Sequence, residues 1–211
     1  MTVGDTSNWD GFFRMNMVPA VLAYIKTVWD EMPKPGLSDL EDAISDKLYF
    51  ALVHAKPRND FPFLIRREDV EFHEDLAMET GRKDIVFFPS LLEEEIYLCI
   101  EAKRLNAIIS GKLRSLANEY VKEGMQRFVD RKYARCVLHG AMLAYVLDGN
   151  IDRAIKNIGK NIKNRLSELR MDTDCCLDAS LIRPDDCRVK ETRHHRVDEK
   201  AVFCIHHIFV A

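Results

Sequence analysis

The chain has 211 residues, which suits one domain, and its 47% hydrophobic and 31% charged residues are ordinary for a globular protein. A net charge of −3 excludes a generally basic surface, so any nucleic-acid binding must come from local patches. The start, MTVGDTSNWD, lacks the basic and apolar regions of a signal peptide, and no stretch approaches the roughly 18 apolar residues of a membrane span. We expect one domain over residues 1–211, in a reducing cytoplasm and not associated with a membrane.

Two helices are predicted before any strand. The first covers residues 17–31, where Asn16 can cap it and an apolar stripe recurs at helical spacing. The segment 33–36, Pro-Lys-Pro-Gly, ends it. The second helix begins at Ser38, which forms a capping-box pattern with Glu41, and it continues to Leu52.

The rest of the chain predicts strands first and then alternating helices and strands. Short β-like runs are expected at 61–65, 70–72, 84–88 and 96–101, with 79–81 as a joint. A helix (112–129), a strand (141–147), a strongly amphipathic helix (151–169), a polar loop (171–191) and a β-like run (201–210) follow. This order predicts an α/β fold with a central mixed β-sheet that is antiparallel in its middle and flanked by helices.

The stretch GRKDIVFFPSLLEEEIYLCIEAKRLN, residues 81–106, carries the most chemical information. One apolar strand begins with Asp84, and the next runs directly into Glu101-Ala102-Lys103. Residues two apart share a face of a strand, so Glu101 and Lys103 should point the same way. A hairpin with its turn at Pro89 and Ser90 would bring Asp84 to Glu101.

Two carboxylates that meet at the edge of an apolar sheet repel each other, and a divalent cation would compensate them. Carboxylate oxygens suit Mg²⁺ or Mn²⁺. Such an ion supports phosphodiester hydrolysis, because it stabilises charge on the phosphate and lowers the pKa of the attacking water. Lys103 would stabilise the developing negative charge or position the water. Asp84 and Glu101 are therefore candidate metal ligands, and Lys103 is a candidate catalytic residue.

These residues resemble the PD-(D/E)XK, or restriction-endonuclease-like, nuclease superfamily. The resemblance rests on Asp84 in GRKDIVFF, on Glu101-Ala102-Lys103 after EEIYLCI, and on the order helix, three strands, helix, strand. It covers residues 38–147 as the core, and leaves the helix at 17–31 and the extension 151–211 outside it. Lys83 stands where the family has proline. The resemblance implies a restriction-endonuclease-like core and a Mg²⁺-dependent DNA endonuclease of restriction, repair or anti-phage defence, with the Ala102 carbonyl as a third metal ligand.

Other interpretations of these residues stay open. Asp84, Glu101 and Lys103 can be surface charges at strand ends, with an ordinary ion pair between the last two. Glu41 lies on the apolar stripe of its helix, and the resemblance implies an active-site glutamate there; it can equally complete the capping box with Ser38. The chain can also be a catalytically silent module that binds nucleic acid or a partner protein, or a structural subunit.

Two helices offer candidate DNA contacts. Arg153, Lys156, Lys160 and Lys163 cluster along one flank of the helix at 151–169, where they can follow phosphates or only face solvent. Gln126 and Arg127 lie on the preceding helix. A homo-oligomer or a partner subunit would help to supply target specificity. A zinc site among Cys187, His194, His195 and Cys204 is conceivable, but these residues lack the paired spacing of zinc ligands, so buried thiols and loop or strand histidines are favoured.

Overall fold

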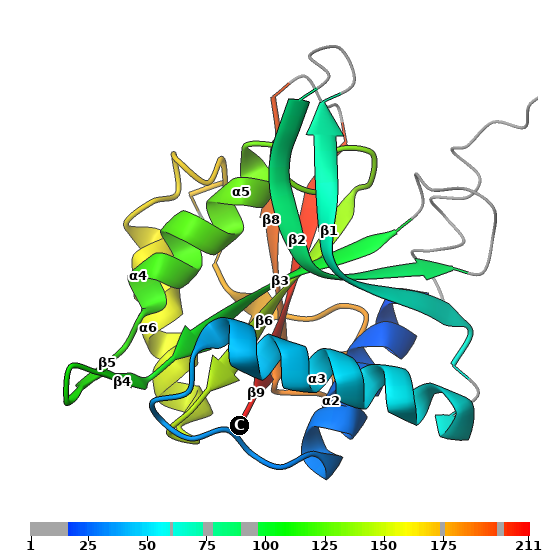
Figure 1. Ribbon diagram of the computed structural model, residues 1–211. Coiled ribbons are helices and arrows are strands. Elements are labelled where there is room, and N and C mark those ends of the chain that lie inside the picture. Colours follow the sequence, from blue (N-terminus) through cyan, green and yellow to red (C-terminus); the bar gives the residue numbers. More distant parts are fainter. Residues whose placement is uncertain (1–16, 60, 74–77, 90–96, 174–175, 198–200) are drawn as a thin grey trace, which may run out of the picture.

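A seven-stranded mixed sheet organises the computed structural model, which describes residues 17–59, 61–73, 78–89, 97–173, 176–197 and 201–211 (Figure 1). The strand order is β1-β2-β3-β6-β9-β8-β7, and a separate two-stranded sheet pairs β4 with β5. The strands are β1 (Phe63–His73), β2 (Met78–Pro89), β3 (Leu98–Leu105), β4 (Ala107–Ile109), β5 (Lys112–Arg114), β6 (His139–Val146), β7 (Asp178–Ala179), β8 (Val189–His194) and β9 (Phe203–Val210). β1, β2 and β3 are antiparallel neighbours, β3, β6 and β9 run parallel, and β8 is antiparallel to β7 and β9. The predicted central mixed sheet is confirmed. The prediction that its middle is antiparallel is wrong, because the three middle strands are parallel and the antiparallel pairs lie towards its two ends.

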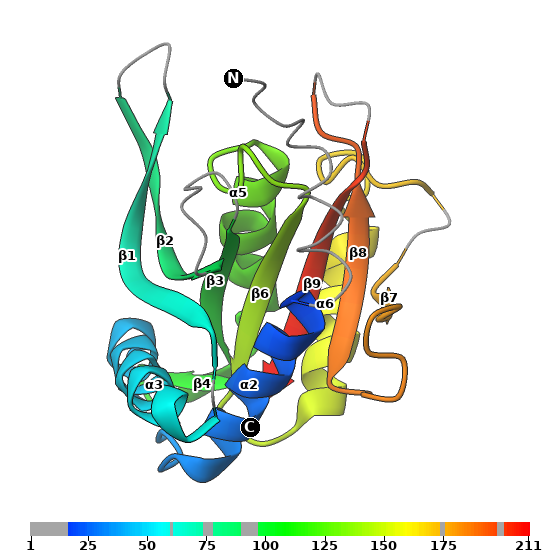
Figure 2. The ribbon, with the colours of Figure 1, turned by 90° about the vertical axis from the view of Figure 1, so that its right-hand side faces the viewer.

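Helices cover both faces of the sheet (Figures 1 and 2). Helices α2 (Val18–Glu31) and α3 (Glu41–Ala55, followed by η2, Lys56–Asn59) pack on one face, over a core that includes the stacked rings of Trp29 and Tyr145. The other face carries α4 (Ala117–Glu119), the π-helical turn η4 (Tyr120–Met125), α5 (Gln126–Val129) and α6 (Ile151–Lys163). None of the described helices is long and apolar enough to cross a membrane.

The two N-terminal helices are present, with corrected starts. Met17 is the N-cap residue of α2, and the predicted cap Asn16 lies outside the described residues. Helix α3 begins at Glu41 and not at Ser38; its N-cap residue is Leu40, and no side chain caps it. The capping box predicted from Ser38 and Glu41 is therefore wrong. The stripe itself is confirmed, because Ile44, Leu48 and Leu52 are all buried.

Strands β1 and β2 form one long hairpin that rises from the rest of the sheet (Figures 1 and 2). The runs expected at 61–65 and 70–72 fall in β1, except that residues 61 and 62 precede it, and the joint predicted at 79–81 lies inside β2. Gly81 does not make a turn there. A Cβ at Gly81 would come 2.5 Å from the ring of Tyr133, so this glycine allows a close packing contact. Of the predicted turn, Pro89 is the last residue of β2, and Ser90 lies outside the described residues.

The helix expected at 112–129 begins only at Ala117, because a small hairpin precedes it. Strands β4 and β5 pair Ile109 with Lys112, which leaves Ser110 and Gly111 as a two-residue turn. Both turn residues have positive φ, 50° and 75°, as a type I′ hairpin turn requires. The Ser-Gly pair was thus a turn signal that the amphipathic pattern obscured.

The C-terminal third differs from the prediction in two places. Helix α6 ends at Lys163, and turns instead of helix carry the chain to Arg170, whose φ is positive. The loop predicted at 171–191 contains β7 and the start of β8. Strand β8 has the polar sequence VKETRH, yet Glu191, Thr192 and His194 are buried. Hydropathy alternation cannot find such a strand.

Candidate active site

Asp84 and Glu101 come together where β2 leaves β3. Ile85 pairs with Ile100 across the two antiparallel strands, and the same register continued by one residue sets Asp84 beside Glu101. The backbone N–H of Ala102 donates a 2.7 Å hydrogen bond to Asp84 Oδ2. The antiparallel pairing that the predicted hairpin required is therefore present. It holds the Asp84 carboxylate against the strand that carries Glu101.

Glu101 is a buried carboxylate whose two oxygens differ in their contacts. Its side chain is 1% exposed, and Oε1 lies 2.9 Å from Lys103 Nζ and 2.8 Å from Arg127 Nη1. Oε2 is buried without a hydrogen-bond partner. Burial, and next the negative charge of Asp84, raise the pKa of Glu101 to about 7. Near neutral pH this group is therefore divided between a carboxylic acid and an anion.

Lys103 links Glu101 on β3 to Glu41, the first residue of α3. Its Nζ lies 2.8 Å from Glu41 Oε1 as well as 2.9 Å from Glu101 Oε1. Burial opposes the charge of Lys103, but the Glu101 and Glu41 carboxylates raise its pKa, so it is an ammonium ion. Gly124 in η4 leaves room for Met142, because a Cβ there would overlap the Met142 side chain, whereas its distance of 3.6 Å from Lys103 Cγ would be an ordinary contact. A side chain, and not another backbone, makes the close approach at this glycine.

Glu41 belongs to this group and not to a helix cap. Its Oε2 accepts a 2.9 Å hydrogen bond from the backbone N–H of Arg104, and its Oε1 contacts Lys103. The first residue of α3 is thereby tied to β3. The four residues predicted as catalytic lie in one connected network, to which the backbone of Ala102 belongs through Asp84.

Two residues of the network had no sequence signal. Arg67 on β1 lies 3.5 Å from Asp84 Oδ1 and donates a 3.1 Å hydrogen bond to the Asp84 carbonyl. Tyr133 accepts a 2.8 Å hydrogen bond from Arg127, the cation beside Glu101. Neither is close in sequence to the motif. Only the pairing of β1 with β2 and the turn after α5 bring them there.

The carboxylates are better compensated than the sequence suggested. Arg67, Lys103 and Arg127 supply positive charge beside Asp84, Glu41 and Glu101. These cations of the protein itself therefore offset part of the repulsion for which the sequence predicted a divalent cation, and the divalent cation stays a prediction. Burial nevertheless raises the pKa of Asp84, although the Ala102 hydrogen bond and Lys103 oppose that shift. The unpartnered oxygen of Glu101 also remains.

The predicted DNA contacts separate into two groups. Arg153, Lys156, Lys160 and Lys163 are all exposed on α6, and Arg153 is paired with Asp148. Gln126 donates to Asp130 and to the Glu168 carbonyl. Arg127, by contrast, contacts Glu101 with a side chain that is 40% exposed, so it is part of the candidate active site.

Lys83 stands where the resembled nuclease superfamily has proline, and its side chain forms ion pairs within the sheet. Its ammonium lies 2.8 Å from both Asp69 and Glu71, and the side chain is 5% exposed. Tyr97 also donates to Glu71, at 2.9 Å. Lys83 therefore ties β2 to β1 beside Asp84, the next residue.

The histidines of the last third fall into two kinds. His194 bonds Thr192 and the Leu169 carbonyl, and His207 bonds Thr192 and Tyr120, so both imidazoles are satisfied in the core. Burial lowers the pKa of His194 to about 4. These two are the structural strand histidines that the sequence favoured.

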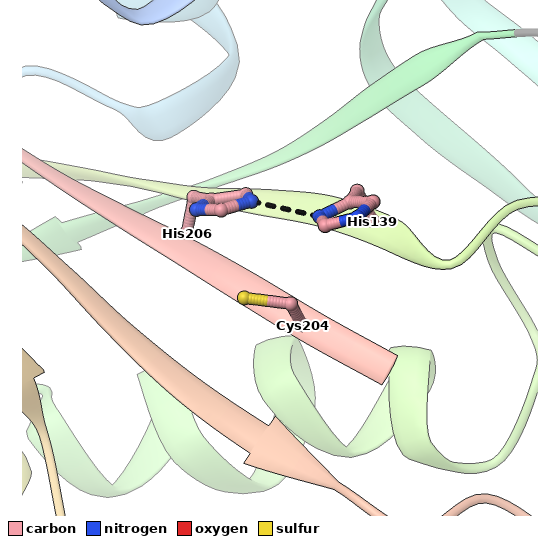
Figure 3. A group of neighbouring side chains, drawn as sticks. All are labelled: His139, Cys204 and His206. Carbon is pink, nitrogen blue, oxygen red and sulfur yellow. Dashed lines mark hydrogen bonds between the residues drawn. The ribbon is translucent and has the colours of Figure 1, made fainter. Parts of the chain in front are cut away.

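Of the zinc ligands considered from sequence, only Cys204 lies in a group of possible metal ligands among the described residues. Cys187 and His195 are exposed, and His195 faces Asp172 at 3.4 Å. Cys204 instead lies beside His206 on β9 and beside His139 on β6 (Figure 3). Burial, and next the neighbouring His139, lower the pKa of His206 to about 3, so this imidazole is neutral. The available signal was the Cys-x-His spacing of two on one strand, which places both side chains on one face.

Comparison of the chain with protein-family models, with curated proteins and with solved structures finds no match. Its function has to be inferred from the residues and their geometry.

Proposed function

We propose that the chain is a Mg²⁺- or Mn²⁺-dependent DNA endonuclease, with Asp84 and Glu101 as metal ligands and Lys103 as the catalytic cation. The observation that carries the proposal is Glu101 Oε2, a buried carboxylate oxygen with no hydrogen-bond partner, on the strand beside Asp84. Burying a polar atom without a partner costs on the order of 1–3 kcal/mol. A bound cation at this position would remove that cost.

The donor set fits a hard divalent ion. Two carboxylates supply oxygen ligands, and a magnesium ion held by one or two carboxylates keeps coordinated water. The Ala102 carbonyl is the third ligand that the resemblance implies. When bound, such an ion supplies charge stabilisation at the scissile phosphate and a more acidic attacking water.

The chain's own residues have separable roles in this proposal. Lys103 presents an ammonium that can stabilise the charge that develops on the phosphate oxygens. Glu41 orients that ammonium through its 2.8 Å contact. Arg127 neutralises one oxygen of Glu101 and leaves the other for the cation.

The order of the elements supports a restriction-endonuclease-like core. Helix α3 precedes the antiparallel strands β1, β2 and β3, the helical segment α4–η4–α5 follows, and β6 then pairs parallel with β3. This is the order helix, three strands, helix, strand that the resemblance implies. Restriction, repair or anti-phage defence in the cytoplasm is the setting that goes with it, with a homo-oligomer or a partner subunit adding target specificity.

The direct test is incubation of the protein with plasmid and single-stranded DNA in Mg²⁺, Mn²⁺ or EDTA. We expect cleavage in either metal and none in EDTA, and we expect Glu101→Gln to be inactive in all three. Metal-dependent cleavage that persists in Glu101→Gln would come from a contaminant or another site, and would contradict the proposal.

The ion pairs favour one second candidate, a catalytically silent module that binds nucleic acid or a partner protein. Glu101 and Glu41 already share the Lys103 ammonium at 2.9 and 2.8 Å, so the group can be stable without a metal. Absence of both metal binding and cleavage, together with intact DNA binding, would select this candidate.

The exposed cations of α6 give a separate prediction about the DNA path. Removing a lysine that binds a phosphate should reduce the slope of log K against log salt by about 0.9 for duplex DNA. The double change Lys156→Gln with Lys160→Gln, in inactive Glu101→Gln protein, should therefore flatten the slope by nearly 2. Lys47→Gln, exposed on α3 in the opposite layer, is the control and should leave the slope unchanged. An unaltered slope in the double variant would show that these lysines only face solvent.

A further inference from the structure

Three metal-ligating side chains meet on the sheet away from the candidate active site. His139 on β6 and Cys204 on β9 are register partners, and His206 follows Cys204 by two residues on the same face (Figure 3). One ligand atom from each lies within 4.8 Å of the others. His206 is 1% exposed and Cys204 is 9% exposed. The group is therefore fixed by strand pairing and not by flexible loops.

The two imidazoles face each other in an arrangement suited to a shared ion. His139 Nδ1 and His206 Nε2 are 3.0 Å apart, and the rings are stacked with centroids 5.2 Å apart. With zinc–nitrogen bonds of 2.0–2.1 Å, two ligands of a tetrahedral ion are about 3.3 Å apart. An opening of a few tenths of an ångström, with a turn of the two rings toward a common centre, would admit the ion in place of the shared hydrogen bond.

His206 also differs from the core histidines beside it. Both ring nitrogens of His194 and of His207 have hydrogen-bond partners. Nδ1 of His206 is buried without one. An imidazole that only filled the core would be expected to satisfy both nitrogens, because buried polar atoms rarely lack partners.

A pocket of about 680 Å³ opens over the cluster. Besides the three side chains it is lined by Pro19, Leu181, Ile182, Glu191, Arg193 and Val202. The side chain of Glu191 accepts from the Leu181 N–H and pairs with Arg193, so the pocket wall is held in place. An ion bound by the cluster could therefore be reached from outside.

We propose that His139, Cys204 and His206 bind one Zn²⁺ ion, with its fourth position open to this pocket. Two imidazole nitrogens and one thiolate match the borderline-soft character of zinc, and three protein ligands plus an exchangeable position are the pattern of catalytic zinc sites. Cys204 gives up its thiol proton to solvent on binding. The bridging proton moves to the other nitrogen of the ring that carries it, which leaves a lone pair on each facing nitrogen. This site is independent of the proposed nuclease centre.

The experiment is titration of the full chain with Zn²⁺ against a chromophoric chelator, together with Co²⁺ as a spectroscopic substitute. We expect one tight equivalent per chain and, with Co²⁺, a thiolate-to-metal charge-transfer band. Cys204→Ser and His139→Gln should each lower the affinity by more than about a hundredfold, since removing even a hydrogen-bond partner of a metal ligand costs 10–100-fold. Cys99→Ser removes another buried thiol and should keep both the affinity and the band.

Glu101→Gln, together with the His139→Gln variant already named, makes the titration decisive. Glu101→Gln must bind Zn²⁺ as the wild type does, which separates this ion from any held at the nuclease centre. His139 is the least buried of the three, so His139→Gln decides the matter if Cys204→Ser does not fold. A wild type without a stoichiometric tight site, or equal affinities in the wild type and folded His139→Gln, would overturn the proposal.

Discussion

Replacing Lys103 with methionine is expected to lower the DNA cleavage rate by two or more orders of magnitude. Loss of one preorganised group that stabilises transition-state charge typically costs that much. The change should also reduce stability, because Lys103 lies between the carboxylates of Glu101 and Glu41 with 13% exposure. Breaking a buried ion pair costs about 3–5 kcal/mol, although protonation of Glu101 would relieve part of this loss.

Single-turnover cleavage should therefore be measured at a temperature where circular dichroism shows the Lys103→Met variant to be folded. Lys122→Met is the matched control, since Lys122 is exposed on η4 two residues before Gly124. It should cleave like the wild type. Folded Lys103→Met that retains most of the wild-type rate would remove Lys103 from the chemistry.

The stability of the metal-free protein should fall as the pH rises towards neutrality. The pKa of Glu101 is about 7 in the folded chain against 4.5 for an ordinary glutamate, because burial and Asp84 disfavour its charged form. The favourable contribution of protonated Glu101 is complete below about pH 4.5 and is lost as the pH rises through 7. A shift of this size corresponds to about 3 kcal/mol in the free energy of unfolding.

Denaturant unfolding between pH 4.5 and 8 in EDTA measures this effect as the difference between the wild type and Glu101→Gln. The variant should lack the decline that Glu101 causes and keep the parts due to other groups. Glu168→Gln, at an exposed position, should follow the wild type throughout. Parallel curves for the wild type and Glu101→Gln would show that Glu101 is not held in an unfavourable charged state.

The central hairpin was predictable because its information is local. Asp84 leads one apolar run, Glu101 ends the next, and the period of two fixes which side chains share a face. The stripe on α6 was equally clear, and its Ile158 and Ile162 are fully buried. Where burial repeats with a fixed period, the sequence alone predicts which side chains of a strand or helix face the core.

The rest depends on contacts between distant residues. Strand β8 can bury Glu191 and His194 because hydrogen bonds satisfy their polar atoms. Its polar sequence therefore has the hydropathy of a loop, and hydropathy does not reveal the strand. Arg67 reaches Asp84 only because β1 pairs with β2 along its whole length. His139 joins Cys204 only through the parallel pairing of β6 with β9. No spacing along the chain encodes these pairings.

The most direct test of the account is whether Asp84 and Glu101 bind a divalent cation. An ion that binds only the folded state adds about 2.7 kcal/mol of stability at a hundredfold excess over its dissociation constant. Above pH 7, Mg²⁺ or Mn²⁺ should therefore raise the melting temperature of the wild type. Asp84→Asn keeps an acceptor for the 2.7 Å hydrogen bond from Ala102 but loses the charge, so its melting temperature should not respond. Equal metal-induced shifts in the two proteins, or no shift in the wild type, would contradict the assignment of this site.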